Sequence, residues 1–68
     1  MDDNQNEPIL QFFAWLHLNA HQQIIAQPFG ELAYKIADTL PRNPERTVAL
    51  RKLLEAKEAA LRAAIYKP

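Results

Sequence analysis

The sequence predicts an all-α protein with one short N-terminal helix followed by two longer antiparallel helices in a single domain. Three observations lead to this prediction. Apolar residues recur at helical spacing in three segments, proline and asparagine separate these segments, and the last segment is rich in alanine. A chain of 68 residues is one small domain, and its 49% hydrophobic content is enough for a packed interior.

The first helix is predicted to begin near Pro8, because proline suits the first turn of a helix. The six residues before Glu7, "MDDNQN", are expected to be a frayed, solvated tail. Trp15 lies off the predicted buried face. That face follows the i, i+3, i+4, i+7 spacing and consists of Ile9, Phe12, Phe13 and Leu16.

The second helix is predicted to run from about residue 20 to residue 40. Asn19 followed three residues later by Gln22 is typical of a capping box, and Pro41 ends the helix. Pro28 is expected to bend the helix, because proline clashes with the preceding turn. Gly30, the only glycine in the chain, is predicted to permit a close backbone approach.

The third helix is predicted over residues 44–65, with Asn43 as its N-cap and Pro44 as its first residue. Its high alanine content favours the helix, and it carries two apolar stripes. The first stripe consists of Leu50, Leu54, Leu61 and Ile65, and the second of Ala49, Leu53, Ala56, Ala60 and Ala63. One stripe can pack on the second helix, and the alanine stripe lets a helix of another subunit approach, so we expect a homo-oligomer.

Cations crowd the start of the third helix, where Arg42, Arg46, Arg51 and Lys52 stand against Glu45 alone. A helix N-terminus already carries partial positive charge and usually attracts anions. Two explanations are open. The arginines and the helix-start amides could bind an anionic ligand, or a carboxylate from the acidic half could pair with them internally. Residues 1–34 carry a charge of −4 and residues 35–68 a charge of +4.

The composition argues against an enzyme. The chain contains no Ser and no Cys, and neither Thr39 nor Thr47 has a histidine nearby in sequence. A single glycine rules out a glycine-rich phosphate loop. His17 and His21 are four residues apart, but the residues between them lack the glutamate of a zinc-protease motif and no third ligand follows. We therefore predict no catalytic residues, no metal and no cofactor.

The charge and hydropathy patterns also bear on partners and location. A net charge of zero argues against binding to duplex DNA. No apolar run approaches the roughly 20 residues of a membrane span, so no membrane partner is expected. No secretion signal is predicted either. The absence of cysteine fits a reducing cytoplasm.

The segment "FFAWLH" offers the residues for a binding site. Trp15 is placed to stack on a nucleobase, and His17, two residues later, is placed to contact a phosphate or a base edge. The alternative is that the aromatic segment is a hydrophobic anchor packed on the other helices, and for Trp15 both explanations are open.

The segment "ELAYKIADTLPRNPERTVALRKLLEAKEAALRAAI", preceded by "FFAWLH" and "QPFGEL", resembles a family of short phage proteins that contains the anti-CBASS cyclic-oligonucleotide sponges. The shared pattern is a Phe-x-aromatic motif with a nearby His, a middle helix ending in Pro, and a final helix with Glu-Arg, Lys-Leu and Glu-Ala. The resemblance covers about residues 12–66. The matching residues are Phe13, Trp15, His17, Pro41, Glu45, Arg46, Ala49, Lys52, Leu53, Glu55 and Ala56.

The resemblance implies a compact helical protomer that assembles into a hexamer inside the infected bacterial host. Such proteins capture cyclic dinucleotides at subunit interfaces and, in some members, cyclic trinucleotides at separate sites. They hold the bacterial immune signal without cleaving it.

The resemblance also implies site residues. Phe13, Trp15 and His17 would form the stacking region, with Trp15 in place of the family's Tyr. Gln27 stands near the family's phosphate-contacting basic residue and departs from it in being neutral. The cations that would compensate are Lys35 or Arg46, and the family's second ligand site falls near Ala60 and Lys67.

Two other functions are open from the sequence. The first is a helical protein–protein interaction module, such as an inhibitor of a host factor, with the aromatic segment as its anchor. The second is a small DNA binder with a helix-turn-helix-like arrangement, against which the zero net charge counts.

Overall fold

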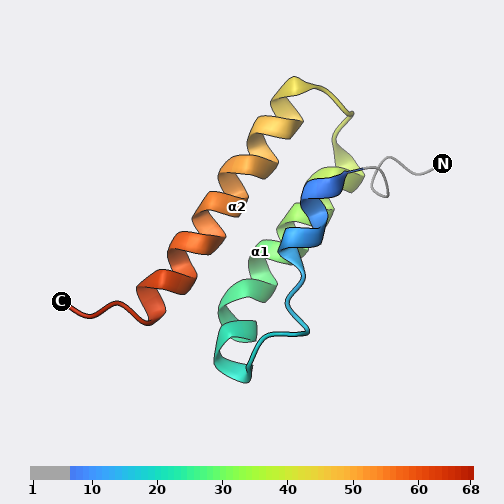
Figure 1. The fold of residues 1–68 in the computed structure, drawn as a ribbon. Helices are drawn as coiled ribbons and strands as arrows, with labels where there is room; N and C mark the ends of the chain where they lie inside the picture. The colour runs from blue at the N-terminus through green and yellow to red at the C-terminus, as the bar shows by residue number, and fades with distance from the viewer. Residues whose placement is uncertain (1–6) are drawn as a thin grey trace.

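The computed structural model describes residues 7–68, and it consists of a short 3-10 helix packed on a hairpin of two long α-helices (Figure 1). The all-α prediction is confirmed for these residues, and the two long helices are antiparallel. The tail predicted for residues 1–6 lies outside the described residues. The elements are η2 (Pro8–Phe13), α1 (Ala20–Thr39) and α2 (Pro44–Ala64).

The first element differs from the prediction in type, length and buried face. It is a 3-10 helix that ends at Phe13, where Ala14 turns extended with φ −62° and ψ 142°. Leu10 and Phe13 are buried, whereas Phe12 is 56% and Leu16 is 81% exposed. A 3-10 helix has three residues per turn, so residues i and i+3 share a face. The face predicted from α-helical spacing is therefore wrong for Phe12 and Leu16.

Helix α1 begins with the predicted capping box. The Asn19 side chain accepts a hydrogen bond from the Gln22 amide at 2.9 Å, and the Gln22 side chain accepts one from the Asn19 amide at 3.4 Å. The helix runs through Pro28 and ends at Thr39, and its C-cap Leu40 is extended before Pro41. Its buried residues are all small, and this lets the other elements approach its backbone closely. They are Ala26, Gly30, Ala33 and Ala37.

Helix α2 begins as predicted. The Asn43 side chain accepts a hydrogen bond from the Arg46 amide at 2.9 Å, and Pro44 is the first helical residue. Leu50 is fully buried. Beyond Lys57 no residue of the helix is buried, although the helix continues to Ala64. Along the first apolar stripe, Leu50 is buried, Leu54 and Leu61 are half-buried and Ile65 is exposed.

The core lies where η2 crosses the hairpin. Its buried members come from all three elements and are Leu10, Phe13, Ala33, Ala37 and Leu50. The molecule is elongated, with extents of 43 × 22 × 16 Å.

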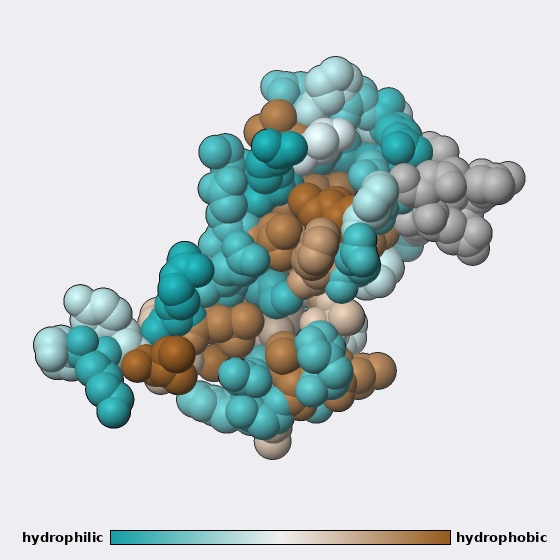
Figure 2. All heavy atoms as spheres, in the orientation of Figure 1, coloured by the Kyte–Doolittle hydropathy of each residue, from teal (hydrophilic) through white to brown (hydrophobic). Residues whose placement is uncertain are grey.

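The two ends of the hairpin differ. We call the end at the α1–α2 connection the closed end and the end formed by the start of α1 and the end of α2 the open end. Hydrophobic side chains lie on the surface of the open end (Figure 2). The large apolar side chains exposed there are Leu16, Ile24, Ile65 and Tyr66.

Candidate ligand-binding site

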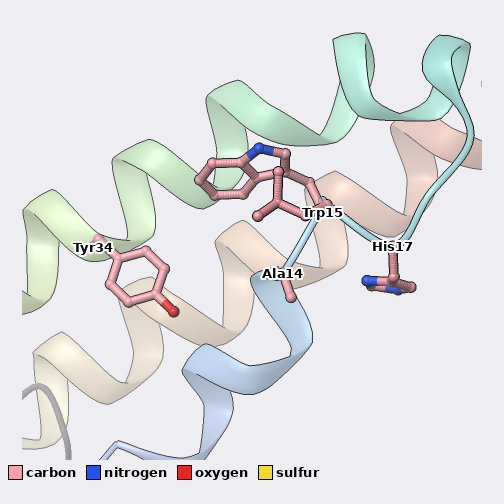
Figure 3. Close-up of a pocket in the computed structure, with 5 residues that line it drawn as sticks. Ala14, Trp15, His17 and Tyr34 are labelled. Atoms are coloured by element: carbon pink, nitrogen blue, oxygen red, sulfur yellow. The ribbon is translucent and has the colours of Figure 1, made fainter.

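An open hollow of about 350 Å³ lies where the chain leaves η2 and crosses α1 (Figure 3). The segment between η2 and α1 supplies most of its wall, and α1 supplies one tyrosine. The lining residues are Ala14, Trp15, Leu16, His17 and Tyr34. Two aromatic rings from different elements therefore line one cavity.

Trp15 occupies its place because Gly30 has no side chain. A Cβ atom on Gly30 would lie 2.7 Å from the Phe13 carbonyl oxygen and inside van der Waals contact with the indole ring. Glycine in a helix interior costs about 1 kcal/mol relative to alanine, so its presence in α1 needs a reason. The close approach of Trp15 and Phe13 is that reason, and the prediction for Gly30 is confirmed.

The backbone after Trp15 is held by hydrogen bonds. The Leu18 amide donates to the Trp15 carbonyl at 3.1 Å and closes a turn. Gln23, in the first turn of α1, donates from its side chain to the carbonyls of Leu16 at 3.2 Å and Leu18 at 2.7 Å. His17 lies inside this turn and is exposed. Its imidazole is thus presented to solvent at the hollow by a tethered backbone.

Tyr34 also lines the hollow, although the sequence did not single it out as a site residue. It lies four residues after Gly30, so it is a neighbour on the same helix face one turn further along. Its ring consequently lines the hollow together with the indole that covers Gly30 (Figure 3). The spacing of an aromatic residue four positions after the only glycine was the available signal. Ala14 and Leu16 had no such signal.

The other predicted site residues lie elsewhere. Phe13 is fully buried in the core, and only its carbonyl approaches Gly30. Gln27 is exposed on α1 and donates to the Glu31 carboxylate at 3.1 Å. Lys35 is exposed and follows Tyr34 in the chain. Ala60 is half-buried and Lys67 is exposed after the end of α2, and neither lines the hollow.

Arg46 is an internal residue, and its assignment to a ligand is corrected. It is 2% exposed, and its Nη2 lies 2.5 Å from a carboxylate oxygen of Glu7. Its Nη1 donates to the carbonyls of Ala37 and Leu40, each at 3.0 Å. Of the two explanations for cations at this helix start, the internal carboxylate is therefore the correct one for Arg46. From the first turn of α2, the guanidinium thus joins the N-terminal segment to the end of α1.

Lys57 is a second buried cation of α2. It is 8% exposed, and its ammonium donates to the Phe12 carbonyl at the end of η2. Lys and Arg are almost never fully buried unless they are paired. The sequence indicated no partner for Lys57, because Phe12 lies 45 residues away in the chain.

The hollow offers stacking and hydrogen bonding rather than a charged cluster. Its polar side-chain groups are the indole N–H of Trp15, the imidazole of His17 and the hydroxyl of Tyr34. Within residues 7–68, no three His, Asp or Glu side chains are grouped so as to hold a metal ion. Over the same residues, no helix has the length and apolar character needed to cross a bilayer. The arrangement suits a ligand with a flat ring and hydrogen-bonding edges.

Comparisons of the chain with protein-family models, with curated proteins and with solved structures found no match. Residues 7–68 thus form a small all-α fold with a hollow lined by two aromatic side chains, which is the candidate binding site.

Proposed function

We propose that this protein is a non-catalytic sponge that binds cyclic oligonucleotides and sequesters them from a CBASS-type bacterial defence. The observation that carries the proposal is the pair of aromatic rings, Trp15 and Tyr34, lining one open hollow beside His17. An aromatic ring that stacks on a nucleobase contributes about 1–3 kcal/mol. The resemblance to the phage sponges, which rests on Trp15 and His17 among others, supports the same ligand class.

The proposed phosphate contacts are His17 and Lys35. His17 is exposed in the wall of the hollow, whereas Lys35 lies outside the wall and is exposed on α1 directly after Tyr34. Arg46 takes no part, because it is buried against Glu7. Gln27 does not line the hollow and is neutral where the phage sponge family places a cation, so we expect ligand choice to depend more on stacking than in members of that family.

The sponge works as a homo-oligomer in the cytoplasm of the infected bacterium, and by resemblance as a hexamer. The support in the structure is the open end, where four large apolar side chains are exposed on one protomer. Contiguous exposed apolar surface marks sites of association. The resemblance favours a second copy of this chain as the partner that covers this apolar surface.

Fluorescence titration tests the proposal directly, because Trp15 is the only tryptophan. A panel of cyclic di- and trinucleotides is added to the full chain, and binding is confirmed by calorimetry. Trp15→Ala should weaken binding by about 5- to 150-fold, which corresponds to the loss of one stacked base. The matched control is Phe12→Ala, an exposed aromatic residue outside the hollow, which should bind as the unaltered protein does.

The fate of the ligand separates a sponge from an enzyme. After heat denaturation of the complex, chromatography should return the cyclic ligand intact. Linear products would show hydrolysis, and the absence of binding by every cyclic nucleotide in the panel would overturn the proposal. Mixed-sequence duplex DNA serves as the negative control, because a chain of zero net charge gains little from counterion release.

A helical protein–protein interaction module is the second candidate. The observation that favours it is again the open end, where Leu16 is 81% exposed beside the hollow. An amphipathic helix from a partner would bind such a surface through its apolar face. This function predicts that no cyclic nucleotide changes the Trp15 fluorescence.

A further inference from the structure

Lys57 joins α2 to the end of η2, and the wall of the hollow begins directly after η2. Its ammonium is buried between α2 and the end of η2, where it donates to the Phe12 carbonyl. The last carbonyls of a helix have no partner within the helix and carry partial negative charge. A buried ammonium therefore satisfies a carbonyl that would otherwise be left without a partner.

The next carbonyl in the chain meets the other long helix. The Phe13 oxygen lies against Gly30 of α1, 2.7 Å from where a Cβ atom would stand. The end of η2 is thus held from two sides, by Lys57 on α2 and by Gly30 on α1. Two residues later, the indole of Trp15 lies on the same glycine.

We propose that Lys57 is a positioning residue for the hollow: by binding the Phe12 carbonyl it holds the end of η2 in the register that lays Trp15 on Gly30. Lys57 does not line the hollow, so it acts on a ligand only through Trp15. The effect on ligand rests on the proposed function, whereas the effect on Trp15 itself does not. Without the ammonium, the partly buried Phe12 carbonyl loses this donor, and we expect the segment that lines the hollow to be held less firmly.

The test uses Lys57→Met in the full chain, since methionine keeps an unbranched apolar side chain and removes the ammonium. The matched control is Lys52→Met on the same helix, where the lysine side chain is 71% exposed. In the absence of ligand, Lys57→Met should lose near-ultraviolet circular dichroism from Trp15 and become more accessible to acrylamide. The Leu18 amide, which donates to the Trp15 carbonyl, should exchange about tenfold faster.

Rescue separates positioning from a general loss of stability. Lys57→Arg keeps a cationic donor and should retain the Trp15 signals of the unaltered protein. If Lys57→Met and Lys52→Met show the same Trp15 dichroism and the same Leu18 exchange, the proposal is overturned.

A measurement on the unaltered protein covers the case in which Lys57→Met does not fold. Nitrogen-15 spectroscopy of the lysine ammonium groups should show slower hydrogen exchange with water for Lys57 than for the exposed Lys52. Equal exchange rates would overturn the proposal.

Ligand binding is measured last, with the same panel of cyclic di- and trinucleotides. The apparent Kd of Lys57→Met should rise as the fraction of molecules with Trp15 on Gly30 falls. If the unaltered protein binds none of them, the proposed function fails, and the dichroism and exchange of the free protein still decide the role of Lys57.

Discussion

The closed end and the open end of the hairpin have similar helices but opposite surroundings. At the closed end, η2 lies against both helices, and Leu10 and Leu50 are buried together with the guanidinium of Arg46. At the open end, Ile24 and Ile65 are each 72% exposed. The difference comes from the third element, because η2 and its buried side chains cover only part of the hairpin.

This difference assigns two roles to the two ends. Apolar burial contributes roughly 25 cal/mol per Å² removed from water, so the free energy of folding is concentrated at the closed end. The open end leaves large apolar side chains exposed, and under the proposed function a second chain would cover them. The hollow lies between the two ends, where the segment after η2 crosses α1.

Arg46→Met should have the largest effect, because it leaves the buried Glu7 carboxylate without its partner. Removing one partner of a buried ion pair costs about 3–5 kcal/mol. The whole domain is stable by about 3–10 kcal/mol at 68 residues, so the change should remove between about a third and all of the free energy of unfolding. Urea unfolding followed by far-ultraviolet circular dichroism measures this.

The control for Arg46 is Arg51→Met on the same helix. Arg51 is exposed, so its replacement should change the free energy of unfolding by no more than about 0.5 kcal/mol. Equal stabilities of the two variants would contradict the assignment of Arg46 to the closed end.

Leu50→Ala should come next. Leu50 is fully buried, and a leucine-to-alanine change in a core costs about 2–5 kcal/mol through lost burial and the cavity left behind. Ile24→Ala at the open end removes a similar volume from an exposed site and should cost no more than about 0.5 kcal/mol. The comparison between the ends would be wrong if both changes lowered the midpoint of thermal unfolding equally.

Gly30→Ala probes the hollow between the two ends. Helix propensity favours alanine by about 1 kcal/mol, but the new Cβ would overlap the Trp15 indole and crowd the Phe13 carbonyl, at a cost of about 1–3 kcal/mol. We expect a net loss of stability and a changed Trp15 emission spectrum. Gln27→Ala, at an exposed site on the same helix, should leave the emission spectrum unchanged. A more stable Gly30→Ala protein with unaltered emission would contradict the close packing.

Ile65→Asp should have the smallest effect on the fold and act on assembly. We expect light scattering coupled to size exclusion at micromolar concentration to show at least a dimer for the unaltered protein and a lower mass for Ile65→Asp. Val48→Asp places the same charge on an exposed valine near the closed end and should keep the oligomer. If the unaltered protein is a monomer under these conditions, the prediction that the open end mediates assembly is wrong.

The sequence by itself determined the helical hairpin. The capping box at Asn19 and Gln22 and the Asn43–Pro44 start join residues at most three apart, so their hydrogen bonds form within one turn whatever the rest of the chain does. The close approach at Gly30 was also predictable, because a glycine in a helix interior is costly without a reason. Trp15 and His17 could be selected for the candidate site from their residue types.

Only the tertiary structure decided which side chains the N-terminal segment buries and what they meet. Glu7 reaches Arg46 across 39 residues, and Lys57 reaches Phe12 across 45, so no local pattern marks either pair. The spacing of Tyr34 from Gly30 placed both residues on one face of α1, but the fold decided that Trp15, from the segment after η2, meets Tyr34 there. Helical periodicity states which residues share a face, but which face is covered depends on where η2 packs. The covered face is decided by contacts between residues distant in sequence. These contacts form only when the chain closes the long loops between their partners.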